Sequence, residues 1–108
     1  MKNVDAYGVF IENMWVGPLK HRADAGLAVM ALGLGGEAGE VQEHIKKFIR
    51  DGKLDKDALL KELGDTIYYA FRIGQHFGFQ PSDVLGTNVK KLRDRKRRGV
   101  TRGSGDNR

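Results

Sequence analysis

The stretch LGLGGEAGEV, residues 32–41, lies inside the longest helical periodicity of this 108-residue chain. From about residue 23 to residue 51, apolar side chains recur every three or four positions, which predicts one long helix. The apolar positions of this pattern are Leu27, Met30, Ala31, Leu34, Ala38, Val41, Ile45, Phe48 and Ile49. Four glycines in its centre are unusual, because each costs up to about 1 kcal/mol relative to alanine in a helix interior. They flank Glu37 and Glu40, so we expect this segment to do more than form a helix.

Three more helices are predicted around this one. Residues 4–14 place apolar side chains at helical spacing, and Gly17-Pro18 then stops the pattern. Asp55 can cap a third helix that ends near Gly78. The apolar stripe of this third helix comprises Leu60, Leu63, Ile67, Ala70, Phe71, Gly74 and Phe77. Residues 81–98 form the fourth helix, which begins at a proline.

The lack of strand-like alternation makes the predicted fold class all-α. The short link of residues 52–56 makes the second and third helices an antiparallel central pair, so we expect a four-helix, bundle-like domain over residues 1–98. Some apolar side chains, such as Val29 and Leu32, lie off the main stripe of their helix. We therefore expect oligomerisation to complete the core, in a homodimer or in a tetramer built from dimers.

The composition limits the chemistry and the compartment. The chain has no cysteine, which excludes a disulfide framework, a thiolate metal site and a cysteine nucleophile. Its N-terminus, MKNVDAYGVF, has an early acid and no continuous apolar segment, so we expect neither a secretory signal nor a membrane span. A cytoplasmic protein without a membrane partner is the expectation.

The formal charge of +5 is concentrated at one end of the chain. Residues 89–108 hold nine Lys and Arg against two Asp, a net +7, which leaves −2 for residues 1–88. The basic segment is suited to phosphate contacts, or it is simply solvated. Residues 99–108 are polar and rich in glycine and arginine, so we expect a basic, disordered C-terminal tail there.

Two pairs of acids, each three residues apart, stand on the second and third helices: Glu37 with Glu40, and Glu62 with Asp65. At about 100° per residue, both pairs border the apolar stripe of their helix on the same rotational side. In antiparallel helices that pack stripe to stripe, this common offset brings the acids to one side of the helix pair. Counted from the link, the midpoints of the two pairs differ in height by about one turn, near 6 Å. The four carboxylates are therefore expected to converge.

Spacing alone leaves two interpretations of these acids open. The pairs can be solvated surface groups, which are common in a chain with 14 acids. They can also hold a hard divalent cation such as Mg²⁺, which prefers oxygen ligands. A di-iron site is disfavoured, because such bundles use Glu-x-x-His. Here His44 follows Glu40 by four residues, and His76 lies eleven residues beyond Asp65.

Three blocks of the chain carry a resemblance to a known family. They are GGEAGEVQEHIKK, then KELGDTIYYAF, and then NVKKLRDR, which together run from about Leu32 to Arg95. In this order they resemble the MazG-like branch of the all-α nucleoside triphosphate pyrophosphohydrolases, and most of all its small single-domain members. The hallmark of that family is Glu-x-x-Glu followed, after a variable spacer, by Glu-x-x-Asp.

The resemblance implies a metal site and a reaction. By motif position, Glu37, Glu40, Glu62 and Asp65 are expected to hold Mg²⁺, with Mn²⁺ as a substitute. The cation would bind the phosphates of a (deoxy)nucleoside triphosphate, and water would attack phosphorus to release a nucleoside monophosphate and pyrophosphate. Glu40 resembles the second glutamate of the family's first motif, so it is the candidate catalytic residue that orients or deprotonates the water.

The resemblance also implies substrate-binding residues, each with a structural alternative. Tyr69 resembles a tyrosine that approaches the nucleoside, and the alternative is a core or interface aromatic. Asn88, Lys91 and Arg95 match a closing Asn-x-x-Lys-Leu-x-x-Arg block that faces substrate. The alternative for these three residues is a solvated helix face.

Two further substrate-binding candidates come from position. Lys47 projects beside Glu40 on the helical wheel, where it can reach a phosphate or pair with an acid. Trp15 is a candidate for stacking on a base, and the alternative is packing at a helix end.

The leading hypothesis is an Mg²⁺-dependent hydrolase of nucleoside triphosphates that removes noncanonical or surplus nucleotides. The alternative is a helical nucleic-acid-binding or regulatory protein that uses the basic C-terminal segment. Under the first hypothesis the central glycines have a purpose. Gly33, Gly35, Gly36 and Gly39 keep the helix slim where a neighbouring helix, a metal or a triphosphate approaches.

Overall fold

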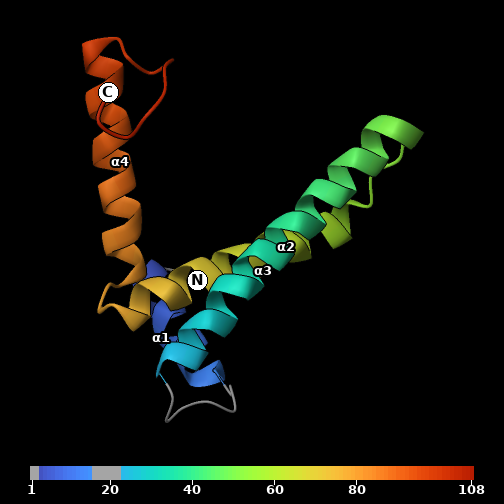
Figure 1. The fold of residues 1–108 in the computed structure, drawn as a ribbon, viewed down its shortest axis with the longest axis horizontal. Helices are drawn as coiled ribbons and strands as arrows, with labels where there is room; N and C mark the ends of the chain where they lie inside the picture. The colour runs from blue at the N-terminus through green and yellow to red at the C-terminus, as the bar shows by residue number, and fades with distance from the viewer. Residues whose placement is uncertain (1–2, 16–22) are drawn as a thin grey trace.

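The computed structural model describes residues 3–15 and 23–108, and within them the fold is all-α with no strand. Its helices are α1 Val4–Met14, α2 Ala23–Asp51, α3 Lys56–His76 and α4 Pro81–Arg98 (Figure 1). These bounds confirm the helices predicted from periodicity, while the expected stop of the first helix at Gly17-Pro18 lies outside the described residues. None of the described helices is both long and apolar enough to cross a membrane.

Capping residues set several helix ends. Asp55 accepts a hydrogen bond through Oδ1 from the backbone N–H of Ala58 at 3.0 Å, so it is the N-cap of α3, as predicted. The carboxylate of Asp83 accepts one from the backbone N–H of Gln80 at 2.8 Å and closes the start of α4. Gly52 follows α2 with a φ of 73°, a left-handed conformation that glycine adopts without strain. The chain can therefore turn sharply into the short link before α3.

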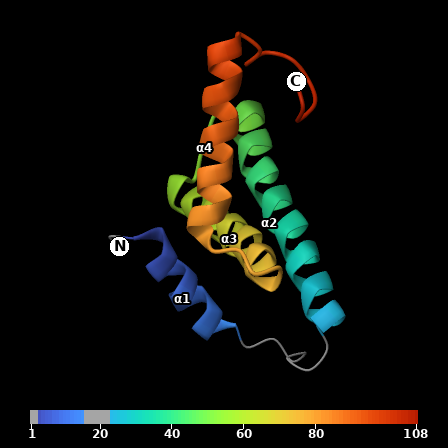
Figure 2. The ribbon, with the colours of Figure 1, turned by 90° about the vertical axis from the view of Figure 1, so that its left-hand side faces the viewer.

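α2 and α3 lie side by side and antiparallel, and this hairpin is the most extensive packing interface of the fold (Figures 1 and 2). The two helices come close at Gly33 of α2. The ring of Tyr69 lies so near that a Cβ on this glycine would be 2.5 Å from it. A glycine at this position therefore lets an aromatic ring of α3 pack directly against the backbone of α2.

α1 is tied to the end of α3 and the start of α4. Gln75 donates a hydrogen bond from Nε2 to the carbonyl oxygen of Gly8 at 2.8 Å. The carboxylate of Asp5 accepts two hydrogen bonds from Ser82, one from its backbone N–H at 2.8 Å and one from its hydroxyl at 2.7 Å. Buried apolar side chains of the described residues come from all four helices: Ile11, Met30, Phe71 and Pro81. The small core therefore lies where α1 meets the hairpin and the start of α4.

α4 diverges from the hairpin. Figure 1 shows α4 starting near the His76 end of α3 and running away from α2, so that the hairpin and α4 enclose an open angle. α4 packs on α1 and on the end of α3, and within the described residues its backbone has no close contact with that of α2. One chain alone therefore leaves its helical bundle open on one side.

The rotation of α3 differs from the expected one. The sequence predicts that the apolar stripe of α3 packs against α2, and this prediction is wrong for the central part of the stripe. Leu60, Leu63 and Ile67 remain 70%, 43% and 48% exposed. The side of α3 toward α2 instead carries Tyr69 and the acid Glu62, both half-buried. An apolar stripe marks a surface to be covered but does not say which helix covers it.

The contact between Gly33 and Tyr69 predicts that side chains added to α2 have position-specific effects. Gly33→Leu would place atoms where the ring of Tyr69 lies, so we expect the free energy of unfolding to fall by about 1–3 kcal/mol. Gly35→Leu is the matched control, because nothing lies within 4 Å of the Cβ position there. It should maintain or raise stability, since leucine favours a helix more than glycine does. Urea unfolding followed by circular dichroism measures both, and equal effects would contradict the contact.

Candidate metal centre

Three carboxylates from α2 and α3 meet in the hairpin interface. Glu37 of α2 and Glu62 and Asp65 of α3 each bring one carboxylate oxygen into a group whose members all lie within 4.8 Å of one another. Glu62 and Asp65 are about one turn apart and point from one side of α3, and the antiparallel packing places Glu37 opposite them. Glu37 and Glu62 are half-buried while Asp65 is exposed, so the group is accessible from solvent on one side.

The crowding of negative charge changes the ionisation of Glu37. Its pKa is raised from 4.5 to about 7, first because its carboxyl shares a hydrogen bond with Glu62. Partial burial and the charges of Glu62, Asp65 and Glu40 raise this pKa further. Near neutral pH a proton on Glu37 therefore compensates part of the negative charge. A cation bound by the same oxygens would displace that proton.

Glu40 lies at the margin of this group. It is exposed and is not one of the three converging carboxylates, although its charge is close enough to contribute to the raised pKa of Glu37. The sequence predicts four converging acids. The structure brings three of them together and leaves the fourth facing solvent at their edge.

The glycines beside the acids are of two kinds. Gly33 is covered by the ring of Tyr69, whereas a Cβ on Gly36 or Gly39 would meet no atom within 4 Å. The surface of α2 next to Glu37 is therefore bare backbone with open space above it. This arrangement fits the expectation that glycines keep α2 slim near the acids.

Two aromatic candidates for substrate binding make contacts within the chain. The ring of Tyr69 packs on Gly33 and lies 5.1 Å from the ring of Tyr68, centroid to centroid, within the hairpin. The guanidinium of Arg72 lies 5.3 Å from the centroid of the Trp15 ring, which is a cation–π contact. Each ring thus has the packing role that the sequence leaves open as its alternative.

The polar candidates for substrate binding lie away from the three carboxylates. Lys47 is exposed on α2, two turns beyond Glu40. Asn88 is exposed on α4, and Lys91 and Arg95 contact the C-terminal residues of the chain. Because α4 leans away from α2, one chain does not bring its own α4 cations to the acids (Figure 1).

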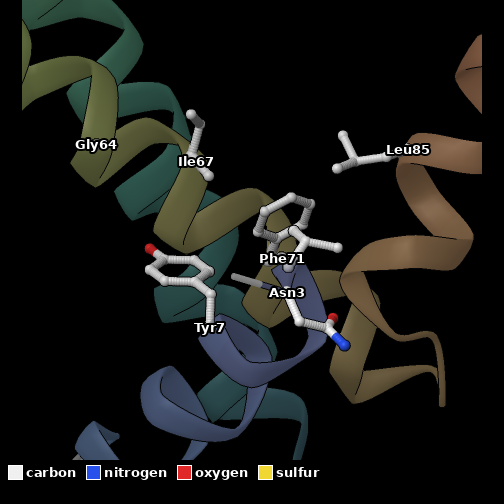
Figure 3. A pocket seen from close by; sticks show the side chains of 7 residues that line it. Asn3, Tyr7, Gly64, Ile67, Phe71 and Leu85 are labelled. Carbon is white, nitrogen blue, oxygen red and sulfur yellow. The ribbon is translucent and has the colours of Figure 1, made fainter. Parts of the chain in front are cut away.

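A cavity that sequence reasoning missed lies between α1, α3 and α4. Its volume is about 560 Å³, and its lining residues are Asn3, Val4, Tyr7, Gly64, Ile67, Phe71 and Leu85 (Figure 3). The pKa of Tyr7 is raised first by burial and then by its neighbours Tyr68 and Asp65, so Asp65 is the acid nearest in effect to this wall of the cavity. Helical spacing identifies Tyr7 as an inward-facing residue. The cavity itself arises from the angle between α3 and α4, for which the sequence contains no signal.

Comparison with known proteins agrees with this geometry. Residues 26–100 match the family model of the MazG nucleotide pyrophosphohydrolase domain. The chain belongs to this MazG family. The matched span contains the three converging carboxylates and all of α3 and α4, so the hairpin that holds the acids is part of the MazG domain.

A phage protein is similar to this MazG chain over nearly its whole length. The gene 37 protein of Mycobacterium phage L5 is 36% identical over 113 residues, which cover 98% of this chain and 99% of that protein. No solved structure matches. Because the similarity to the phage protein extends beyond residues 26–100, α1 belongs to the unit that the two chains share.

The raised pKa of Glu37 predicts how stability depends on pH without a divalent cation. A carboxyl with a pKa of about 7 when folded and 4.5 when unfolded binds its proton more tightly in the folded chain. The free energy of unfolding therefore falls as the pH rises through this window, because the unfolded state binds fewer protons there. Glu37→Gln has no titratable carboxyl at this position, so its free energy of unfolding should fall less between these pH values. Urea unfolding with a chelator between about pH 5 and pH 8 measures both slopes, and an unchanged slope would contradict the shared proton.

Proposed function

We propose that this MazG domain hydrolyses (deoxy)nucleoside triphosphates to a nucleoside monophosphate and pyrophosphate, with Mg²⁺ as its cofactor. The observation that carries the proposal is the convergence of Glu37, Glu62 and Asp65 in a hairpin of this family. Their oxygens are the donor set of a hard divalent cation, and within the described residues no histidine joins the group. Removal of noncanonical or surplus nucleotides is the role that we expect.

The residues present fit an oxygen-ligated cation. The raised pKa of Glu37 supports this, because the group takes up a proton where its charge is not otherwise compensated. Glu37, Glu62 and Asp65 would hold Mg²⁺, or Mn²⁺ in its place, with Glu40 next to them as the fourth acid. When bound, the cation would neutralise phosphate charge, orient the phosphates and lower the pKa of a bound water.

The residues of the chain itself have separate tasks in this proposal. The exposed carboxylate of Glu40 orients the attacking water or accepts its proton, because it is not held in the central group. The open backbone at Gly36 and Gly39 admits phosphate oxygens that no side chain blocks. Contacts of substrate with Lys47, Tyr69 and Trp15 stay predictions.

We also infer that the protein works as a homo-oligomer. The apolar stripes on both sides of the open angle stay exposed: Leu60, Leu63 and Ile67 on α3, and Leu85, Val89 and Leu92 on α4. A second copy that covers them removes apolar surface from water. It also brings Asn88, Lys91 and Arg95 of its α4 toward the acids of the first copy, where they bind the phosphates. A homodimer achieves this, and so does a tetramer built from dimers.

The alternative of a nucleic-acid-binding protein has less support. Five of the nine cations in residues 89–108 make hydrogen bonds within the chain: Lys91, Arg95, Arg97, Arg98 and Arg108. A nucleic-acid backbone would have to displace all five sets of contacts along this segment, whereas a triphosphate needs only Lys91 and Arg95. Nucleic acid therefore remains a secondary partner, and the cytoplasmic location stays a prediction.

The proposal predicts Mg²⁺-dependent release of pyrophosphate from at least one nucleoside triphosphate. Glu62→Gln and Asp65→Asn should each lower kcat/KM by about a hundredfold or more, because a bound cation contributes several kcal/mol to the reaction. Asp57→Asn changes another acid of α3, in its first turn, and is the matched control that should retain activity. Pyrophosphate detection over a panel of canonical and modified triphosphates measures these effects.

All three variants should retain the helical circular dichroism of the original chain, since none replaces a buried apolar side chain. If the original chain cleaves no triphosphate with Mg²⁺ or Mn²⁺, the proposed activity is wrong. If cleavage survives both substitutions at full rate, the proposed metal centre is wrong.

If copies of the chain associate through the apolar residues of the open angle, a charged substitution there should weaken association without unfolding the single chain. Leu92 is 49% exposed in the single chain, so Leu92→Glu should change the stability of a lone chain very little. In an oligomer the new glutamate at position 92 would place a charge in an apolar interface. We therefore expect the dissociation constant of the oligomer to rise at least about tenfold. Thr87→Glu, on the opposite side of α4, is the matched control. Light scattering during size-exclusion chromatography measures the mass, and a monomeric mass of the original chain would contradict the inference.

A further inference from the structure

The C-terminal residues of the chain fold back onto α4. Gly99 ends α4 with a φ of 74°, and residues 100–108 turn back beside the last turns of the helix (Figure 2). Arg108 holds this loop together by donating hydrogen bonds to the carbonyl oxygens of Val100 and Thr101 at 3.0 and 3.1 Å. The composition of this tail predicts disorder, whereas the structure assigns it these specific contacts.

The tail places an anion on two cations of α4. The carboxylate of Asp106 lies 3.1 Å from Nζ of Lys91 and 3.2 Å from Nη2 of Arg95. The same Nη2 donates hydrogen bonds to the carbonyl oxygens of Gly105 and Asp106 at 3.3 and 2.8 Å. The side chain of Arg95 is only 7% exposed as a result. Lys91 and Arg95 therefore form a two-cation site that is filled by the chain's own tail.

Two features indicate that the tail is a poor ligand for this site. Nε of Arg95 is buried and has no hydrogen-bond partner among the described residues, so the tail leaves a guanidinium donor unsatisfied. Asp106 itself is 81% exposed, and ion pairs with so exposed a partner contribute little free energy. A phosphate carries more negative charge than the single carboxylate of Asp106, and it can accept two parallel hydrogen bonds from a guanidinium. A phosphate group is therefore able to displace the tail.

We propose that the C-terminal tail is a built-in competitor of substrate, in which Asp106 occupies the phosphate-binding cations Lys91 and Arg95 until a triphosphate displaces it. The inference rests on the proposed function, in which these two cations bind the phosphates. In this proposal tail and phosphate compete for the same two side chains, because Nζ of Lys91 and Nη2 of Arg95 are held by the tail. The competition is the same whether the acids belong to the same chain or to a second copy, because the tail lies on the α4 that carries the cations.

A tail that competes with substrate raises KM and does not change kcat. Only the fraction of molecules with the tail released binds substrate at these cations, so the apparent affinity is reduced by that fraction. Once the triphosphate is bound, the tail is displaced and the reaction proceeds as it would without a tail. This separation of KM from kcat distinguishes competition from a structural role of the tail.

Removal of the Asp106 carboxylate tests the proposal. Asp106→Ala should lower KM for the triphosphate by about three- to fivefold at unchanged kcat, since exposed ion pairs shift equilibria by about that factor. Deletion of residues 103–108 also removes the carbonyl contacts and should lower KM by about tenfold. Asn107→Ala is the matched control, because the contacts of the tail with Lys91 and Arg95 come from its neighbours and not from Asn107.

Titration calorimetry with inorganic tripolyphosphate provides a readout that needs no turnover. The dissociation constant should fall by the same factors in Asp106→Ala and in the deletion variant, and it should stay unchanged in Asn107→Ala. If the original chain cleaves no triphosphate, the proposed function is wrong, and this titration still decides the competition. An unchanged dissociation constant and KM in both tail variants, a higher KM, or a lower kcat would overturn the proposal.

Discussion

Repulsion between like charges across the α2–α3 interface is the constraint on which the rest of the structure depends. Three carboxylates within 4.8 Å repel one another, and the hairpin holds them together with a proton shared between Glu37 and Glu62. The helices lie close enough for this because Gly33 admits the ring of Tyr69. The most extensive packing interface of the chain is therefore also the place where its metal chemistry is proposed to occur.

Placing acids in this interface has a consequence for the apolar residues of α3. A two-helix hairpin buries one face of each helix, and the face of α3 toward α2 carries Glu62 and Tyr69. The stripe that includes Leu63 and Ile67 therefore turns outward and stays partly exposed. Such a stripe favours association, because covering it removes apolar surface from water. The acidic interface and the proposed oligomer thus follow from the same rotation of one helix.

The sequence predicts those parts of the fold that depend on local chemistry. The helix bounds follow from periodicity and from caps such as Asp55, and the meeting of Glu37 with Glu62 and Asp65 follows from a short link that forces antiparallel packing. The rotation of α3 is not predictable, because an apolar stripe looks the same whether its own chain or another copy covers it. The contact of Asp106 with Lys91 is equally hidden, since an ion pair between distant residues leaves no periodic signal.

Two groups of like charge are partly neutralised by other groups of the same chain. They are the three acids of the hairpin and the cations Lys91 and Arg95. A proton on Glu37 offsets part of the acidic group, and Asp106 offsets Lys91 and Arg95. In the proposed function, a triphosphate that carries a divalent cation would replace both, because its metal would substitute for the proton and its phosphates for the carboxylate of the tail. A free cation or a metal-free phosphate would replace only one of them. The free energy of binding would then be a difference between two sets of ionic contacts, and this difference would favour the metal–triphosphate complex over either component alone.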